Sequence, residues 1–175
     1  MSVKSTVREA TSAVKKALHA GTDADMQTDI LDTLKKEHDE VKALLSKLEK
    51  SEPAAERRHL VQQIKAALVP HTKAEERVVY DAIIALQDKD ARIDGHEGYL
   101  EHEWASKTLV RLDSIENATS PEHHAAGKVL KDLVEHHIEE EESAVWSDVK
   151  QNFSDDERRQ MNRAFEAAKA KVRIH

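Results

Sequence analysis

Two His-x-x-x-Glu pairs in the sequence have a spacing that suits metal binding. One pair is His71 with Glu75, and the other is His137 with Glu141. Residues four apart lie on one face of an α-helix, with Cβ atoms roughly 6 Å apart, so each pair can direct an imidazole and a carboxylate to one point. A chain with 11 His and 34 acidic residues can produce one such pair on a solvated helix face. The surroundings of the pairs therefore decide what they mean.

Both pairs belong to a degenerate internal repeat. The interval between His71 and His137 also separates the apolar residues around the first pair from those around the second. A second element, Glu-His, occurs at Glu37-His38 and recurs after nearly the same interval at Glu101-His102. All four histidines interrupt apolar stripes at positions that should face a core. The repeat predicts two helical hairpins that face each other and bring the four histidines together.

The donor set favours two metal ions rather than one. Four imidazoles and two carboxylates exceed what one tetrahedral zinc ion uses, whereas two octahedral ions sharing bridging carboxylates could use all six. Because the chain has 0 Cys, any metal must use nitrogen and oxygen donors. Iron is the preferred metal, and manganese or zinc is the weaker alternative. Hydrogen-bonded core histidines are the competing interpretation, but six buried polar groups without good partners would cost roughly 1–3 kcal/mol each. The predicted ligands are His38, His71, Glu75, His102, His137 and Glu141.

One alternative register stays open at the second pair. His136 and Glu140 have the same spacing one residue earlier, but their stripe continues through Ser143 and does not match the repeat. His137 with Glu141 is therefore preferred.

Other polar side chains near the pairs have less defined roles. Tyr80 and Tyr99 are expected to pack as core aromatics rather than to supply a phenolate or a hydrogen bond to a metal. Outer carboxylates can orient ligand histidines by accepting their N–H bonds, and for Glu37, Glu101 and Glu140 solvent exposure is an equal alternative. The remaining histidines lack a carboxylate partner on an apolar stripe and are expected at the surface: His19, His59, His96, His123, His124 and His175.

The elements that must position these residues are helices. Aromatic residues make up only 3% of the chain and charged residues 35%, with 4 Gly and 3 Pro, a composition typical of helical proteins. We expect an all-α fold with four main helices and short flanking helices at both ends. The expected division is an accessory N-terminal helix within 1–22, a four-helix domain over 23–152 and a C-terminal helix within 153–175.

Capping residues and breakers predict where the helices begin and end. Thr22 and Asp25 resemble a capping box for a helix that runs to about Lys50, and Pro70 should kink the next helix, which carries Leu60 to Leu86. The polar segment 88–95 is expected to be a loop before the third helix. Ser120 should cap a helix that reaches about Lys150, and a capping box at 154–157 should open the last one.

These motifs resemble the hemerythrin-like family with its HHE cation-binding domain. The resemblance lies in Glu-His at 37–38 and 101–102 and in His-x-x-x-Glu at 71–75 and 137–141, and it covers about residues 30–150. It implies an up-down-up-down four-helix bundle around a non-haem di-iron centre, with an oxo or hydroxo bridge and bridging carboxylates at Glu75 and Glu141. Dioxygen, nitric oxide or peroxide would be its small ligands.

Two departures from the oxygen-carrying members of that family bear on function. Those proteins take two histidines four residues apart from the third helix, but positions 98 and 106 here are Gly98 and Ser106, so a fifth histidine is missing. They also use His-x-x-x-x-Asp on the last helix, where this chain has His-x-x-x-Glu. Reversible oxygen transport is therefore not expected to carry over, and redox or iron-handling roles gain weight. The absence of Cys disfavours the members that repair iron–sulfur clusters.

Three functions follow as hypotheses. The first is a di-iron protein that binds or senses dioxygen, nitric oxide or iron. The second is an oxidative-stress enzyme acting on peroxide or ferrous iron, with peroxidase, catalase-like or ferroxidase activity. The third is a metal-free helical interaction module. A net charge of −7 without a dense basic run disfavours nucleic acid and anionic membranes as partners, and the start of the chain lacks the apolar core of a signal peptide, so a cytoplasmic location is expected.

Overall fold

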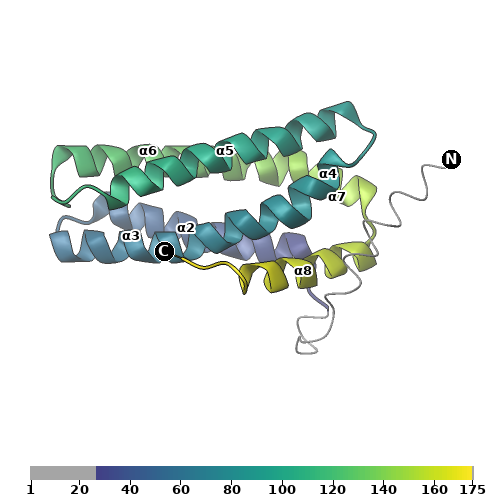
Figure 1. Ribbon diagram of the computed structural model, residues 1–175, viewed down its shortest axis with the longest axis horizontal. Coiled ribbons are helices and arrows are strands. Elements are labelled where there is room, and N and C mark those ends of the chain that lie inside the picture. The colour runs from purple at the N-terminus through teal and green to yellow at the C-terminus, as the bar shows by residue number, and fades with distance from the viewer. Residues whose placement is uncertain (1–26, 175) are drawn as a thin grey trace.

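The structure is a computed structural model that describes residues 27–174 (Figure 1). Within this range the chain is helical and contains no strand, which confirms the all-α prediction. Short π-helical turns and short helices continue two of the long helices. The elements in chain order are α2 (Ile30–Lys50), α3 (Ala54–Glu75), η1 (Glu76–Tyr80), α4 (Asp81–Ile84), α5 (Lys89–Asp113), α6 (Pro121–Glu140), η2 (Glu141–Val145), α7 (Trp146–Asn152) and α8 (Asp155–Lys169).

The four long helices lie side by side, and α8 runs along α2 and α3 (Figure 1). Each long helix contacts two others, since α2 packs on α3 and α6 while α5 packs on α6 and α3. Their apolar residues form two separate clusters rather than one continuous core. One cluster includes Leu34, Val79 and Phe165, and the other includes Leu45 and Leu130. Helices α2 and α3 contribute buried residues to both clusters, and the layer between the clusters can hold polar side chains.

Side-chain caps fix where the helices begin. Asp29 caps α2 by accepting from the N–H of Leu31 at 3.0 Å, and Ser120 caps α6 by accepting from the N–H of His123 at 3.2 Å, as predicted for Ser120. Ser154 and Glu157 form the predicted capping box of α8, which ends at Lys169.

Two predicted boundaries are wrong. The expected start at Thr22 lies outside the described residues, but residues 27–29 are not helical, so the helix that ends at Lys50 begins only at Ile30. Segment 88–95 is not a loop, because the side chain of Asp88 accepts from two backbone N–H groups and starts α5 at Lys89. Gly95 lies inside α5, where a Cβ would come within 2.7 Å of Ile84, so this glycine allows close packing and does not break the helix.

Both His-x-x-x-Glu motifs lead into a π-helical turn. Turn η1 begins directly after Glu75, and turn η2 begins at Glu141. Pro70 does not end α3, which continues to Glu75. Single π-turns inside α-helices occur frequently at functional sites, and their recurrence in both halves of the repeat indicates a shared structural requirement.

Arg57 joins two interhelical connections at one end of the molecule. Its side chain is 1% exposed, and its guanidinium donates to the backbone carbonyls of Leu48, Ser51 and Ala118, each at 2.7 Å. The fourth partner is Nδ1 of His123 at 3.0 Å. These four partners are uncharged acceptors, so Arg57 acts as a clamp between the α2–α3 and α5–α6 connections.

His123 is therefore not a surface residue, contrary to expectation. It is 2% exposed because it faces the Arg57 clamp, and burial together with the Arg57 charge lowers its pKa. A neutral imidazole can accept the Arg57 hydrogen bond. His59 and His96 are exposed as expected and His124 is partly buried, whereas His19 and His175 lie outside the described residues.

No helix within residues 27–174 has both the length and the apolar character needed to cross a membrane.

Candidate metal centre

The six residues predicted as ligands converge in the polar layer between the two apolar clusters. Each long helix contributes one histidine, and the carboxylates come from the end of α3 and the start of η2. All six residues are buried, with exposed fractions of 0–7%. They are His38, His71, Glu75, His102, His137 and Glu141. The structure therefore brings all six to one depth in the molecule.

The histidines form two pairs. The rings of His38 and His71 lie 5.2 Å apart between centroids, and those of His102 and His137 lie 4.6 Å apart. In the second pair the two Nε2 atoms approach to 3.0 Å, so both point at the same small volume. Each pair joins two neighbouring helices, α2 with α3 and α5 with α6.

Each carboxylate contacts one histidine from each pair. Oε2 of Glu75 lies 3.2 Å from Nε2 of His71 and 3.5 Å from Nε2 of His102. Oε2 of Glu141 lies 3.3 Å from Nε2 of His38 and 3.7 Å from Nε2 of His137. Two donor sets, His38–His71–Glu75 and Glu75–His102–His137, each have their ligand atoms within 4.8 Å of one another. Two cation positions bridged by carboxylates would have this arrangement.

Buried donor atoms without hydrogen bonds support this interpretation. Nε2 of His38, both carboxylate oxygens of Glu75 and Oε2 of Glu141 have no hydrogen-bond partner, although they lie within ion-pair distance of other groups in the centre. A buried polar group left without a partner costs about 1–3 kcal/mol. Cations coordinated by these atoms would remove that cost, so the residues present fit a metal centre.

An outer carboxylate faces the second nitrogen, Nδ1, of every histidine in the centre. Two of these contacts, from Glu37 to His71 and from Glu101 to His137, involve residues considered from the sequence. The other two were missed, although Glu76 directly follows Glu75 in the sequence and Glu142 directly follows Glu141. The Nδ1 to carboxylate distances are 2.9 Å for His71–Glu37, 2.7 Å for His137–Glu101, 3.1 Å for His38–Glu142 and 3.4 Å for His102–Glu76. Such contacts hold an imidazole with Nε2 directed at a metal.

The alternative register lies outside the centre. The side chains of His136 and Glu140 are 61% and 47% exposed and lie 3.5 Å from each other. Glu140 therefore contacts His136 and not a histidine of the buried layer. His137 and Glu141 occupy that layer because η2 begins directly at Glu141.

Tyr80 is part of the centre rather than an ordinary core aromatic. Its side chain is fully buried, its hydroxyl lies 3.3 Å from Nε2 of His102 and 3.4 Å from Nε2 of His137, and it donates to Glu141 at 3.3 Å. Tyr99 points elsewhere and donates to Asp81. Sequence periodicity could not distinguish the two tyrosines.

Burial and neighbouring charges shift the pKa values of several groups in the centre. Burial lowers the pKa of His71, but the carboxylates of Glu75 and Glu37 outweigh burial and raise the pKa to about 10. Burial raises the pKa of Glu75, but His71 outweighs it and lowers the pKa to about 2. Burial lowers the pKa of His102 to about 4. Burial and the charges of Glu141 and Glu75 hold the pKa of Tyr80 well above its usual value. His102 is thus neutral and ready to coordinate, whereas His71 carries a proton that a cation must displace.

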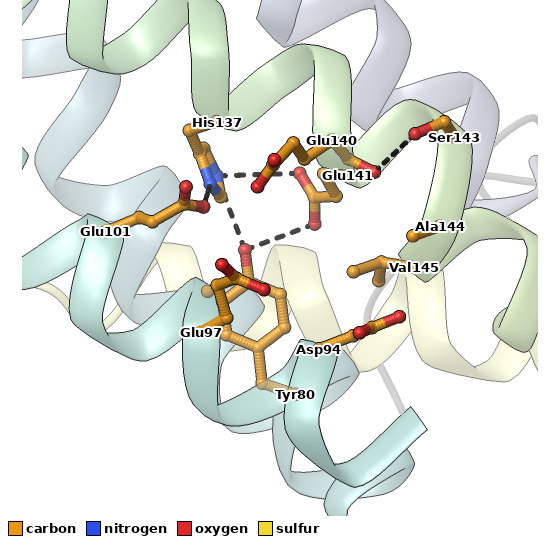
Figure 2. A pocket seen from close by; sticks show the side chains of 11 residues that line it. Tyr80, Asp94, Glu97, Glu101, His137, Glu140, Glu141, Ser143, Ala144 and Val145 are labelled. Carbon is orange, nitrogen blue, oxygen red and sulfur yellow. Dashed lines mark hydrogen bonds and ion pairs between the residues drawn. The ribbon is translucent and has the colours of Figure 1, made fainter. Parts of the chain in front are cut away.

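A pocket of about 200 Å³ reaches the centre between α5 and the α6–η2 segment (Figure 2). Tyr80, His137 and Glu141 line its inner part, and Glu97, Glu101 and Glu140 lie around it. A second pocket lies beside His102 and Glu76, and it is lined by Lys73 and Lys107 as well as by Ser106.

An all-helical domain whose buried histidines and carboxylates converge from four helices has the donor set of a cation-binding helical protein. The Hemerythrin HHE cation binding domain family matches residues 29–149, which is more than half of the chain and contains all six residues of the centre. The chain belongs to this family, as the motifs predicted.

A curated relative is also similar to the chain. It is a "DNA nickase" of Nostoc sp. (strain PCC 7120 / SAG 25.82 / UTEX 2576), 26% identical over 170 residues, which cover 97% of this chain and 47% of the relative. The chain thus spans about half of that protein's length. No solved structure matches the chain.

Proposed function

We propose that the centre binds two iron ions and that the protein binds or senses dioxygen, nitric oxide or iron. One observation carries this proposal. Glu75 contacts one histidine of each pair, and Glu141 contacts the other histidine of each pair. Two imidazoles per cation with shared carboxylates suit a pair of iron ions, and manganese is the next best fit. When bound, a di-iron centre supplies reversible ligand binding or redox chemistry with dioxygen, nitric oxide or peroxide. The four long helices around it would follow an up-down-up-down order.

Tyr80 would complete the donor set on one side. Its hydroxyl is almost equidistant from Nε2 of His102 and Nε2 of His137, the two nitrogens that would hold the second ion. Gly98, four residues before His102, is one of the two positions at which a fifth histidine could stand, and a Cβ there would lie 2.6 Å from Cζ of Tyr80. We infer that the phenol takes the place of that histidine. A Tyr80→Phe variant loaded with ferric iron should then lack the visible phenolate-to-iron absorption band of the wild type.

The test of metal binding is elemental analysis together with the absorption spectrum, before and after addition of nitric oxide or peroxide. The wild type should contain about two irons per chain. His71→Ala and Glu141→Ala should each lose at least one ion, whereas His59→Ala, which changes an exposed histidine outside the centre, should keep both. Equal metal content in the wild type and both centre variants would refute the site.

An oxidative-stress enzyme is the second candidate function. The observation that favours it is the pocket that connects the surface with Tyr80, His137 and Glu141, since a small substrate such as peroxide could reach the centre through it. Spectral change without turnover supports the binding function, and oxygen release from peroxide or oxidation of ferrous iron supports the enzyme.

A DNA-directed function is suggested only by the printed name of the Nostoc relative. The pocket leading to the centre is lined by five carboxylates and, among the described residues, by no lysine or arginine, and the chain carries a net charge of −7. Both features repel phosphate groups. We therefore expect the iron-loaded protein to leave supercoiled plasmid intact. Relaxation of plasmid by the wild type, but not by His71→Ala, would overturn this expectation.

A further inference from the structure

The two halves of the repeat differ in how their histidine pairs are shielded from solvent. In the first half, Lys169 of α8 contacts the free carboxylate oxygen of Glu37, and Phe165 of α8 packs edge-on against His71 with ring centroids 5.9 Å apart. Glu101 is the counterpart of Glu37, and its second oxygen faces His136 at 3.7 Å instead of a lysine. Helix α8 therefore covers one side of the centre, and the equivalent side within the described residues opens into the pocket of Figure 2.

The open side carries an unusual concentration of carboxylates. Asp94, Glu97, Glu101, Glu140 and Glu141 line the pocket. Burial and the negative charges of Glu140, Glu101 and Asp94 raise the pKa of Glu97, so these carboxylates repel one another electrostatically across the pocket. A space bounded by like charges attracts cations, because the low-dielectric walls focus the field.

Two observations indicate that a cation, and not only solvent, suits this space. Ligand atoms of Glu101, His136 and Glu140 lie within 4.8 Å of one another and offer a nitrogen and two carboxylates. At the inner part of the same pocket lies Glu141, a side chain 1% exposed whose Oε2 has no hydrogen-bond partner. The pocket thus leads from an outer donor group to a buried carboxylate oxygen that has no hydrogen bond.

We propose that this pocket is the route by which divalent cations reach the centre and that Glu101, His136 and Glu140 form an outer cation site on it. The proposal rests on the proposed metal-binding function. Glu101 links the two sites, because its Oε2 lies 2.7 Å from Nδ1 of His137 while its Oε1 faces His136. A cation held at the outer site lies next to the second histidine pair and can pass inward to Glu141.

The repeat and the second pocket explain why this route is specific to one side. Aligning His71 with His137 places Pro70 and Ala74 where the second half has His136 and Glu140, so the first half has no counterparts of these two outer donors. The pocket beside His102 is lined by Lys73 and Lys107, and each lysine pairs with a glutamate of the same pocket, so this lining lacks the excess negative charge of the acidic pocket. The acidic pocket is the opening that fits a cation.

The test is the rate at which the metal-free protein takes up Co²⁺, followed by the visible absorption of Co²⁺ in the centre. The variant Glu97→Gln/Glu140→Gln removes two charges from the pocket. The control Glu40→Gln/Glu116→Gln removes two charges at exposed positions that line neither pocket. At low ionic strength the pocket variant should load roughly tenfold more slowly than the control, and the difference should shrink in high salt.

His136→Ala tests the outer site directly and should also slow uptake, although its side chain lies outside the buried layer. Equal loading rates in the pocket and control variants would overturn the proposed route, and so would equal slowing of both, which would indicate only an effect of net charge. If the wild type takes up no Co²⁺, the proposed function itself fails, and this inference fails with it.

Discussion

Tyr80 fills the space that Gly98 leaves open on α5. A Cβ at position 98 would lie 2.6 Å from Cζ and 3.0 Å from the hydroxyl of Tyr80, closer than carbon atoms approach without displacement. The tyrosine ring lies 5.1 Å from the ring of His102 between centroids, so the glycine permits the phenol to reach the histidines. The buried position of the Tyr80 phenol therefore depends on the absence of a side chain at position 98.

Replacing Gly98 by alanine should destabilise the protein. The added Cβ would push the Tyr80 ring away from the contacts that its hydroxyl makes with His102, His137 and Glu141, and overpacking of this kind costs typically about 1–3 kcal/mol. Urea unfolding of the metal-free protein should show this as a lower midpoint. Gly127→Ala is the matched control, because its Cβ would meet Leu48 at an ordinary 3.5 Å and alanine favours a helix interior by roughly 0.5–1 kcal/mol. A Gly98→Ala variant as stable as Gly127→Ala would contradict the close packing.

Removal of an outer carboxylate should weaken metal binding without removing a ligand. Glu142 contacts Nδ1 of His38 at 3.1 Å, and neutral Glu142→Gln should lower metal affinity by about tenfold or more, as outer partners of metal-bound histidines do. Competition with a chelator measures this affinity. Glu139→Gln changes an exposed residue nearby and should bind metal like the wild type. Identical affinities for the two variants would show that Glu142 does not orient His38.

Metal binding should release a proton at neutral pH. The carboxylates of Glu75 and Glu37 raise the pKa of His71 to about 10, so this imidazole is protonated in the metal-free protein at pH 7, and a cation must displace that proton. His102, whose pKa burial lowers to about 4, has no proton to lose. Affinity should therefore rise about tenfold per pH unit from His71 alone until the pH approaches the pKa of that imidazole, and acidification should release metal.

A pH indicator in weakly buffered solution measures this proton directly when Co²⁺ is added at neutral pH to the wild type and to His71→Gln. The wild type should release more protons per bound ion than His71→Gln, which has no imidazole to deprotonate at this position. Equal release per bound ion by the two proteins would show that His71 does not carry the raised pKa.

Arg57→Met should destabilise the protein by about 3–5 kcal/mol. The substitution leaves the carbonyls of Leu48, Ser51 and Ala118 buried without their donor, and unsatisfied buried polar groups cost about 1–3 kcal/mol each. Arg57→Lys should not restore stability, since one ammonium group cannot match the fork of the guanidinium. Arg58→Ala, at an exposed position, should be nearly neutral in the same thermal or urea unfolding experiment. A stable Arg57→Met would contradict the clamp.

The two helical hairpins place their paired histidines in the same way relative to the interhelical connection. His102 and His137 lie almost the same number of residues from Ser120, one before it and one after it. His38, in contrast, lies clearly fewer residues from Ser51 than His71 does. Measured from the observed helix ends, the two hairpins are alike. In each hairpin the second histidine lies farther from the connection than the first, and by the same number of positions. The apparent difference came from the long connection after Asp113.

Side-chain direction helps to explain why this shared offset still brings the rings together. Helical side chains lean toward the N-terminus of their own helix. In each hairpin the first histidine therefore reaches away from the connection and the second reaches toward it. Both displacements reduce the offset between the rings.

The sequence by itself determined the helical class, the family and the six residues that converge, because ligand spacing and apolar periodicity are local properties of a helix and the repeat duplicated them. The N-terminal division at 22 and the metal identity remain predictions. Only the tertiary structure decided which carboxylate faces which imidazole, that Tyr80 rather than Tyr99 enters the centre, and that His123 is buried by Arg57. These facts depend on contacts between helices far apart in the chain, and a periodic pattern within one helix holds no information about the side chains that another helix places against it.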